Sequence, residues 1–345
     1  MHTKSNFRPR IIIHGCGNVG LRVARYCDRK GWNVVAAFNR SGPKVGQDIG
    51  QLAGLNKDLG VIVAEAETID IPRGFADIVL VATKTGDFLE AGYPIYEKYL
   101  SAGINVIAHG SQPHNPFFDN PEVAKKIEAL ARANQVTFTG STIWDATRIW
   151  AGILAASTCV DIECVEHLAT GEPGLQNPAY EAGVGFGMTV EEFNAKFPNG
   201  SHPLEIFLHG PPVMVLQNLG CTISKVKKRS EPMVLETARY SRHSKIEYPA
   251  GVVGGLRVIA EVDTVEGIRG RAQVEYRLFA EGEAELTSWK IHGTPGMEIN
   301  VARGDAGALS AASIINRIPD VIAARPGIVE IFSKEMGPMS SSALL

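Results

Sequence analysis

Cysteine is scarce in this chain, and its five cysteines show no recognisable pairing. The number is odd and no two lie in a CxxC arrangement, which excludes the common zinc ribbons and argues against a disulfide framework. The sequence also lacks an apolar run of the roughly 18 residues that a membrane-spanning helix requires, and residues 1–10 contain no signal-peptide core. We therefore expect five reduced, buried thiols, no metal site and a cytoplasmic protein.

The chain also carries little net charge. Its 34 Lys and Arg residues against 37 Asp and Glu residues give a formal net charge of −3. No basic surface is therefore predicted for nucleic acid or for an anionic membrane. The hydrophobic fraction of 45% and the charged fraction of 21% are typical of a globular enzyme. Because 345 residues exceed what one compact core usually holds, we expect two domains. Since no basic surface is predicted, the partner that we expect is a small-molecule substrate.

What the sequence does contain is a glycine motif directly behind an apolar, β-branched run at residues 11–13. The first glycine of such a motif makes a tight turn, the second lets the backbone approach a pyrophosphate, and the third lets a helix pack on the strand. Apolar residues at helical spacing follow the motif. The alternative is a glycine-rich turn in another strand–helix unit. We predict a dinucleotide-binding loop made of Gly15, Cys16, Gly17, Asn18, Val19 and Gly20.

A further absence bears on the cofactor, because no carboxylate follows the strand predicted at residues 33–38. Sites that prefer NAD usually place Asp or Glu there, to accept a hydrogen bond from the ribose 2′-hydroxyl. These positions hold Asn39, Arg40 and Ser41 instead. A guanidinium can bind a 2′-phosphate through two hydrogen bonds, and the nearby Lys44 adds positive charge. The alternative is an ordinary solvated loop. We predict that NADP(H) is preferred over NAD(H).

Strand and helix alternate through the first part of the chain. Short apolar runs at residues 77–82 and 105–108 are typical of buried parallel strands. The apolar stripe at residues 121–134 is that of an amphipathic helix. This order predicts an α/β fold, with a Rossmann-type, doubly wound parallel sheet in residues 1–145.

The pattern changes in residues 146–303, where apolar residues alternate at 255–264 and 271–280. Such alternation predicts antiparallel strands, and a continuous helix is expected at residues 203–218. We expect an α+β domain with an open mixed sheet, which binds substrate and forms the dimer contact. Since few helices follow these strands, we expect the apolar faces of two such sheets to be opposed in a homodimer.

The last part of the chain, residues 304–345, predicts a C-terminal helix and a tail. Asp305 is placed to cap the start of the helix. Pro319 should end it, since proline removes a backbone donor and clashes with the preceding turn. We expect this segment to pack back on the first domain.

Ligands of a doubly wound sheet lie beyond the carboxyl ends of its strands. Thr83 follows one such strand and is expected to contact the cofactor. After the next strand, His109 is predicted to be the proton donor or to contact the nicotinamide carboxamide, because its ordinary pKa suits proton exchange near neutrality. The alternative is a packed loop histidine. Ser111 is expected to contact substrate, and Gln112 is predicted to orient substrate or a catalytic water.

A second group of candidates follows the last predicted strand of the first domain. Trp144 offers an apolar wall for substrate. Asp145 is predicted either to bind a substrate ammonium group or to hold a catalytic histidine. The alternative is that Trp144 packs the domain junction and Asp145 caps the next helix. Further candidates are His114 as a proton donor, and His167, Asn177 and Tyr180 as substrate contacts.

Taken over most of its length, the chain resembles the 2,4-diaminopentanoate dehydrogenases and related native amine dehydrogenases. These belong to a superfamily that shares its N-terminal domain with dihydrodipicolinate reductase. The resemblance implies an NAD(P)H-dependent enzyme that interconverts an amine with a carbonyl compound and ammonia, and a dimer built through the sheet of the second domain. Besides the glycine motif, it is carried by the segments at residues 42–50, 102–107, 304–308, 316–319 and 324–327.

The sequence departs from these relatives at the expected catalytic positions. Such amine dehydrogenases carry a catalytic Glu a few residues past the fifth strand, whereas residues 108–114 read AHGSQPH, with no acid. Dihydrodipicolinate reductases carry a His-His pair followed by Lys, whereas residues 166–168 read EHL. We expect amine dehydrogenase or reductive aminase-type hydride transfer to a small ketone or imine. The alternatives are reduction of a cyclic imine or dihydrodipicolinate-like heterocycle, and a non-catalytic NADP-binding sensor.

Overall fold

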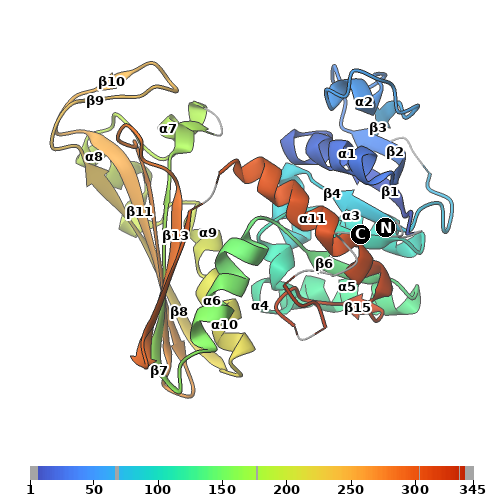
Figure 1. The fold of residues 1–345 in the computed structure, drawn as a ribbon. Helices are drawn as coiled ribbons and strands as arrows, with labels where there is room; N and C mark the ends of the chain where they lie inside the picture. Colours follow the sequence, from blue (N-terminus) through green and yellow to red (C-terminus); the bar gives the residue numbers. More distant parts are fainter. Residues whose placement is uncertain (1–6, 67–69, 176–177, 303, 334, 339–345) are drawn as a thin grey trace, which may run out of the picture. The chain divides into compact units, whose positions relative to one another are not determined.

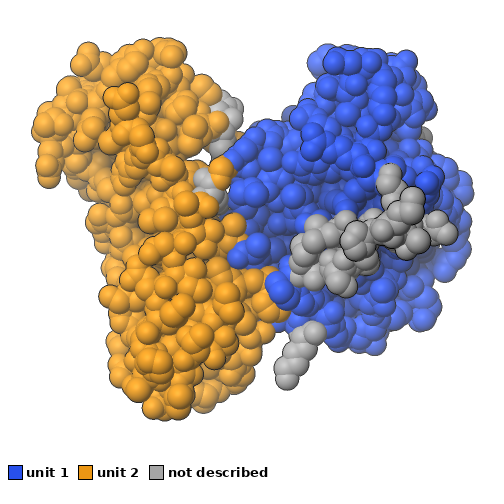
Figure 2. Space-filling view, viewed as in Figure 1, with its two compact units in different colours: residues 1–146, 305–345 blue, residues 147–304 orange. Residues whose placement is uncertain are grey.

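The structure is a computed structural model that describes residues 7–66, 70–175, 178–302, 304–333 and 335–338. The chain forms two compact units. Unit 1 contains residues Met1–Ala146 and Asp305–Leu345, and unit 2 contains residues Thr147–Gly304 (Figure 2). Within the described ranges, every helix is too short or too polar to cross a membrane.

Unit 1 is built on a seven-stranded sheet in which all neighbouring strands run parallel. The strand order is β15-β6-β5-β4-β1-β2-β3 (Figure 1). The direction of strand succession reverses between β1 and β4, which is where ligands of such sheets bind. This confirms the predicted Rossmann-type sheet. Its strands are β1 Arg10–His14, β2 Asn33–Asn39, β3 Val63–Glu65, β4 Ile78–Val81, β5 Asn105–Ala108, β6 Thr137–Gly140 and β15 Gly327–Ile328.

Helices cover both faces of this sheet. Ile11 and Ile13 of β1 pack in one core cluster with residues of α1 and α11, and Ile12 packs in a second cluster with residues of α3 and α5. The separation follows from the strand, because successive side chains point to opposite faces. The helical segments of unit 1 are α1 Asn18–Lys30, α2 Ile49–Leu52, η1 Lys84–Asp87, α3 Leu89–Ser101, η2 Gln112–His114, α4 Pro116–Asp119, α5 Pro121–Ala133 and α11 Ala306–Ala323.

Helix α11 does not end at Pro319, as the sequence predicts, but continues through it. Ile318 and Val321, on either side of the proline, are at most 1% exposed. Burying one such side chain stabilises by about 1.5–3 kcal/mol, which is comparable to the roughly 3 kcal/mol that proline costs inside a helix. Because α11 packs along α1 and the sheet, tertiary burial overrides the local signal.

Unit 2 contains a six-stranded mixed sheet with the order β14-β13-β7-β12-β11-β8, which confirms the predicted open mixed sheet. β7 and β12 run parallel, and the other neighbours are antiparallel. The strands are β7 Asp161–Gly171, β8 Ile223–Val234, β11 Val253–Thr264, β12 Arg269–Arg277, β13 Leu286–Thr294 and β14 Met297–Ala302, with β9 Arg239–Tyr240 and β10 Glu247–Tyr248 paired separately.

The helical segments of unit 2 precede most of its strands in the chain. The expected helix at residues 203–218 is divided in two, because it is interrupted at His209 and restarts with two prolines in its first turn. The segments are a π-helix η3 Asp145–Trp150, which begins in unit 1, and α6 Ala151–Ala156, η4 Pro173–Leu175, α7 Ala179–Gly183, α8 Val190–Lys196, η5 Pro198–Gly200, α9 Glu205–Leu208 and α10 Gly210–Asn218.

The expected uncovered apolar sheet face, on which the homodimer prediction rests, is wrong. Val258 of β11 and Val274 of β12, on that face, are at most 1% exposed. Helices earlier in the same unit cover them, and Leu208 of α9 belongs to the same core cluster. The opposite face of the sheet carries ion pairs instead, namely Arg229–Glu261, Arg257–Glu275, Arg271–Glu166 and His292–Glu166.

Candidate cofactor and catalytic site

The three glycines of the motif differ in the space that surrounds them. A side chain would clash at two of them and would fit at the other. Gly15 has φ +109°, and a Cβ there would lie 2.3 Å from the Ala82 carbonyl oxygen. A Cβ at Gly20 would lie 2.0 Å from the Gly15 carbonyl oxygen, whereas one at Gly17 would meet no described atom within 4 Å. Gly15 and Gly20 therefore allow close packing of the chain. Gly17 leaves open space at the start of α1, which fits the approach of a pyrophosphate.

The start of α1 has the features of an anion-binding helix terminus. Gly17 is its N-cap residue, and no described side chain caps it. The first turn contains no acidic residue, so its N–H groups and the positive end of the helix dipole remain directed toward the open space. Val19 packs against the core of unit 1, and the Asn18 side-chain oxygen accepts a hydrogen bond from Arg22 Nε at 2.8 Å.

The end of β2 braces the glycine loop. The Asn39 side-chain oxygen accepts a hydrogen bond from the Cys16 backbone N–H at 3.3 Å, and Lys44 Nζ donates to the Cys16 carbonyl at 2.6 Å. Arg40 and Ser41, the next residues after β2, have exposed side chains. Asn39 and Lys44 therefore hold the glycine loop, whereas Arg40 and Ser41 are exposed.

Thr83 lies beside the same loop, because its Cγ2 would be 3.2 Å from a Cβ on Gly15. Its hydroxyl oxygen accepts a hydrogen bond from the Gly86 N–H at 3.2 Å, within the turn that follows β4. The loops after β4 and β5 are in close contact, since a Cβ on Gly110 would lie 2.3 Å from the Gly86 carbonyl oxygen.

The loop after β5 differs from expectation in two respects. Burial, and then the charge of His114, lower the pKa of His109 to about 4. The ring is therefore neutral at pH 7 and is a hydrogen-bonding group rather than an acid. The Gln112 side-chain oxygen accepts a hydrogen bond from the Leu89 N–H at 2.9 Å, so it caps α3 instead of pointing into open space. The Ser111 N–H donates to Asp87 at 3.2 Å.

Asp145 lies in a buried polar network rather than on a wall open to substrate. Its side chain is 2% exposed, which argues against the predicted contact with a substrate ammonium group. Oδ1 lies 3.0 Å from His114 Nε2, and Oδ2 accepts a hydrogen bond from the Ser141 hydroxyl at 2.6 Å. Burial raises the pKa of this carboxyl. The hydrogen bond from His114 and the charges of His114 and Arg317 outweigh burial and leave the pKa below its ordinary value.

Arg317 was not identified from the sequence, because it lies on α11, far along the chain from Asp145. Its Nε is 3.7 Å from Asp145 Oδ2, and both side chains are 2% exposed. Trp144 is partly buried, and its ring centroid lies 6.0 Å from that of His114.

The predicted substrate contacts of unit 2 have different environments. His167 is fully buried, with its ring centroid 5.0 Å from that of Trp289, so it is a core residue rather than a substrate contact. Tyr180, on α7, is 43% exposed. Asn177 lies outside the described residues.

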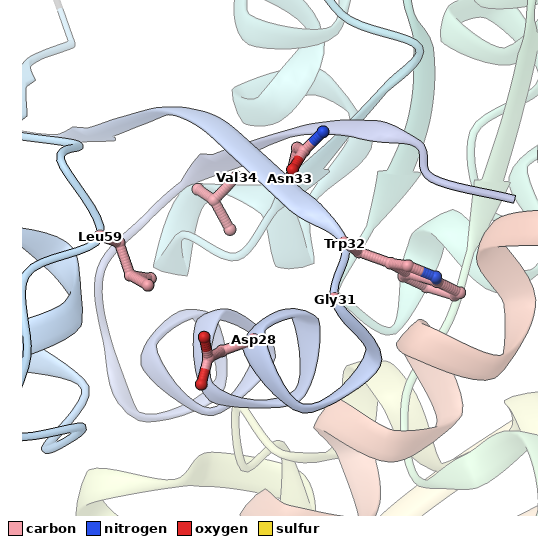
Figure 3. A pocket seen from close by; sticks show the side chains of 6 residues that line it. All are labelled: Asp28, Gly31, Trp32, Asn33, Val34 and Leu59. Atoms are coloured by element: carbon pink, nitrogen blue, oxygen red, sulfur yellow. The ribbon is translucent and has the colours of Figure 1, made fainter. Parts of the chain in front are cut away.

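A small pocket of about 230 Å³ lies at the far end of α1, where Gly31 and Trp32 connect it to β2 (Figure 3). The 13 residues of α1 put its two ends roughly 20 Å apart. This pocket is therefore separate from the glycine loop. Its lining residues are Asp28, Gly31, Trp32, Asn33, Val34 and Leu59.

Comparison with known proteins agrees with this geometry. Residues 153–339 match the family described as the 2,4-diaminopentanoate dehydrogenase C-terminal domain. The chain is 26% identical to 2,4-diaminopentanoate dehydrogenase of Acetoanaerobium sticklandii, over 93% of this chain and 92% of that protein.

Solved structures are also similar to this chain. Amine dehydrogenase from Mycobacterium smegmatis is 26% identical, with a TM-score of 0.81, covering 96% of this chain and 97% of that chain. Myo-inositol 2-dehydrogenase from Lactobacillus plantarum, at 14% identity and a TM-score of 0.56, covers 97% and 95% and shares the fold.

The Rossmann sheet, the glycine loop and these relatives define an NAD(P)-dependent oxidoreductase. The matched region spans more than half of the chain. The protein belongs to the 2,4-diaminopentanoate dehydrogenase family, which confirms the resemblance found in its sequence.

Proposed function

We propose that this protein is an NADP(H)-dependent amine dehydrogenase that reduces the imine of a small ketone and ammonia, and oxidises the amine in reverse. Its family membership supports amine chemistry, because its relatives are named 2,4-diaminopentanoate dehydrogenase and amine dehydrogenase. The observation that carries the choice of reaction is the loop after β5. It presents a neutral imidazole at His109 and has no carboxylate in residues 109–116.

This loop suits C=N reduction better than C=O reduction. The bound reduced nicotinamide supplies a hydride. A ketone that accepts a hydride becomes an alkoxide and needs a proton from a nearby acid. A protonated imine, C=NH₂⁺, already carries its proton and becomes a neutral amine, CH–NH₂. Neutral His109 is a poor acid, but it can accept a hydrogen bond from the N–H of a protonated imine.

The proposed preference for NADP(H) rests on the end of β2. The exposed Arg40 and Ser41 follow the strand, and no carboxylate stands there to bind a ribose 2′-hydroxyl. Lys44 lies against the glycine loop through its bond to the Cys16 carbonyl. We assign the 2′-phosphate to Arg40 and Ser41, and the pyrophosphate to Gly17, Asn18 and the start of α1.

The test is consumption of NADPH and, in parallel, NADH with a panel of small ketones, with and without ammonium. Consumption that requires ammonium supports the proposal. Consumption with ketone alone contradicts the preference for C=N. Consumption with preformed cyclic imines alone indicates the heterocycle reductase, and tight NADPH binding without any turnover indicates an NADP-binding sensor.

We also propose a homodimer, formed through the ion-paired face of the unit 2 sheet rather than its apolar face. Positively charged arginine and negatively charged glutamate side chains lie at adjacent positions on that face. Such a surface can pair with a second copy about a two-fold axis. Light scattering should give the dimer mass, and Arg257→Glu should shift it toward the monomer. A monomer at all concentrations contradicts the proposal.

A further inference from the structure

The ring of His114 is enclosed between two hydrogen-bond acceptors. Nδ1 lies 2.7 Å from the Gly110 carbonyl oxygen, which can only accept, so Nδ1 carries a hydrogen. Nε2 lies 3.0 Å from Asp145 Oδ1, and the side chain is 0% exposed. The Thr142 hydroxyl oxygen lies farther from Nε2, at 3.4 Å. If the carboxylate is ionised, the closer contact favours donation from Nε2 to Asp145. The imidazole is then a buried cation.

The remaining contacts of Asp145 favour its ionised form. Oδ1 also accepts a hydrogen bond from the Thr142 N–H at 2.9 Å, and Oδ2 accepts one from the Ser141 hydroxyl at 2.6 Å. Arg317 lies 3.7 Å from Oδ2 on the other side. A carboxylate held by donors and cations in this way favours its charged form even when buried.

Arg317 extends the network to the end of the described chain. Its guanidinium donates to the carbonyl oxygens of Met336 at 2.6 Å, of Gly337, and of Pro338 at 3.0 Å. Only a guanidinium supplies donors in enough directions to bind three carbonyls and face a carboxylate. A continuous series of contacts therefore runs from the C-terminal segment through α11 to Asp145, then to His114, and ends at Gly110.

Gly110 follows His109 directly, so the network ends at the loop that carries the candidate substrate contact. Burial first, and then the charge of His114, oppose protonation of His109, whereas the charge of Asp145 favours it. Asp87, which accepts a hydrogen bond from the Ser111 N–H, is a further acidic side chain at this loop.

We propose that His114, Asp145 and Arg317 are positioning residues for the reaction: they fix the loop after β5 and present His109 as an uncharged hydrogen-bond acceptor. The role in catalysis rests on the function proposed above, whereas the charge state of His114 and its effect on His109 do not. The two parts can therefore fail separately.

The first measurement uses the unaltered protein without substrate. Nitrogen-15 NMR distinguishes an imidazolium ring, with both nitrogens protonated, from either neutral tautomer. We expect both ring nitrogens of His114 to carry hydrogen, because each faces an acceptor, while His109 is neutral. Hydrogen on only one ring nitrogen of His114 overturns the proposal without any variant having to fold.

The second measurement compares His114→Gln with Ser141→Ala. The glutamine removes the cation, so the titration midpoint of His109 should rise from about 4 by on the order of one unit. Ser141→Ala removes a hydrogen bond from the same carboxylate but no charge, and the His109 midpoint should not move. His14, buried on β1 with its Nδ1 2.8 Å from the Tyr99 hydroxyl, is an internal reference that should titrate identically in all three proteins.

Turnover then tests the positioning role. In His114→Gln, kcat should fall by roughly 10- to 100-fold, because a displaced loop costs orientation of the substrate, and the affinity for NADPH should stay within a few fold. A wild-type His109 midpoint in folded His114→Gln refutes the charge coupling. An unchanged kcat despite a shifted midpoint refutes the positioning role. Absence of turnover in the unaltered protein counts against the proposed function alone.

Discussion

Two glycines of the same motif should respond oppositely to the same substitution. At Gly17, φ −85° and ψ −165° are accessible to alanine, and the added Cβ meets no described atom within 4 Å. The free energy of unfolding of Gly17→Ala should therefore stay within about 0.5 kcal/mol of the wild-type value. At Gly20 the Cβ would lie 2.0 Å from the Gly15 carbonyl oxygen, which is backbone and cannot swing away. The free energy of unfolding of Gly20→Ala should be lower than that of the wild type by about 1–3 kcal/mol or more.

Gly17→Ala should weaken NADPH binding strongly, although it leaves the free energy of unfolding nearly unchanged. A methyl group on Gly17 would occupy the open space that we assign to the pyrophosphate. Loss of one hydrogen bond to a charged phosphate corresponds to about 1.5–3 kcal/mol, or roughly 10- to 150-fold in Kd for NADPH. Gly31→Ala, at the other end of α1, is the matched control. Its φ of +66° should cost about 1 kcal/mol of stability, and NADPH affinity should not change.

Urea unfolding and NADPH fluorescence titration measure the two quantities on the same samples. Tight NADPH binding by Gly17→Ala would refute the placement of the pyrophosphate. Wild-type stability of Gly20→Ala would refute the close packing of α1 on the glycine turn.

Four further outcomes can be measured. Arg40→Ala should weaken NADPH binding by about 1.5–3 kcal/mol and leave NADH binding unchanged; equal affinity of the unaltered protein for both cofactors would contradict the role of Arg40. Asp145→Ala should lower the free energy of unfolding by about 3–5 kcal/mol, since it leaves buried cations unpaired, and a loss below 1 kcal/mol would show that the network is not stabilising. His109→Ala should lower kcat by roughly 10- to 150-fold, as expected for a hydrogen bond to a charged group, and the profile of kcat against pH should show no limb near pH 6.5. Burial lowers the pKa of His14 to about 4, so between pH 6.5 and 4 the unfolded chain binds a proton that the folded chain does not. The free energy of unfolding should therefore fall as the pH falls through that window. In His14→Phe this fall should be smaller.

Features set by neighbouring residues could be predicted from the sequence. The parallel sheet of unit 1 follows from its apolar runs, and the glycine loop follows from turn chemistry. The burial of His167 could be predicted in the same way from its neighbours. His167 alternates with Val165 and Ala169 on β7, and that alternation marks the buried side of the strand, where the structure places all three residues.

Features set by distant residues could not be predicted. β8 has exposed lysines and no apolar alternation that would predict it, and it is an edge strand that pairs with β11 alone in its sheet. The continuation of α11 past Pro319 depends on packing against α1. The contact between Asp145 and Arg317 joins residues from opposite ends of the chain, and no local pattern encodes such a pair.

The division of unit 1 into two separate stretches of chain has a consequence for its synthesis. The glycine motif leaves the ribosome early, but α11 and β15, which complete its domain, emerge only after all of unit 2. Until then the side of the sheet that α11 covers, including Ile11, Ile13 and Leu80, lacks part of its apolar cover. We therefore expect the cofactor-binding domain to mature only after the residues from 305 onward have been synthesised. A nascent or truncated chain that stops before residue 305 should bind chaperones rather than NADPH, although every residue of the glycine motif is present.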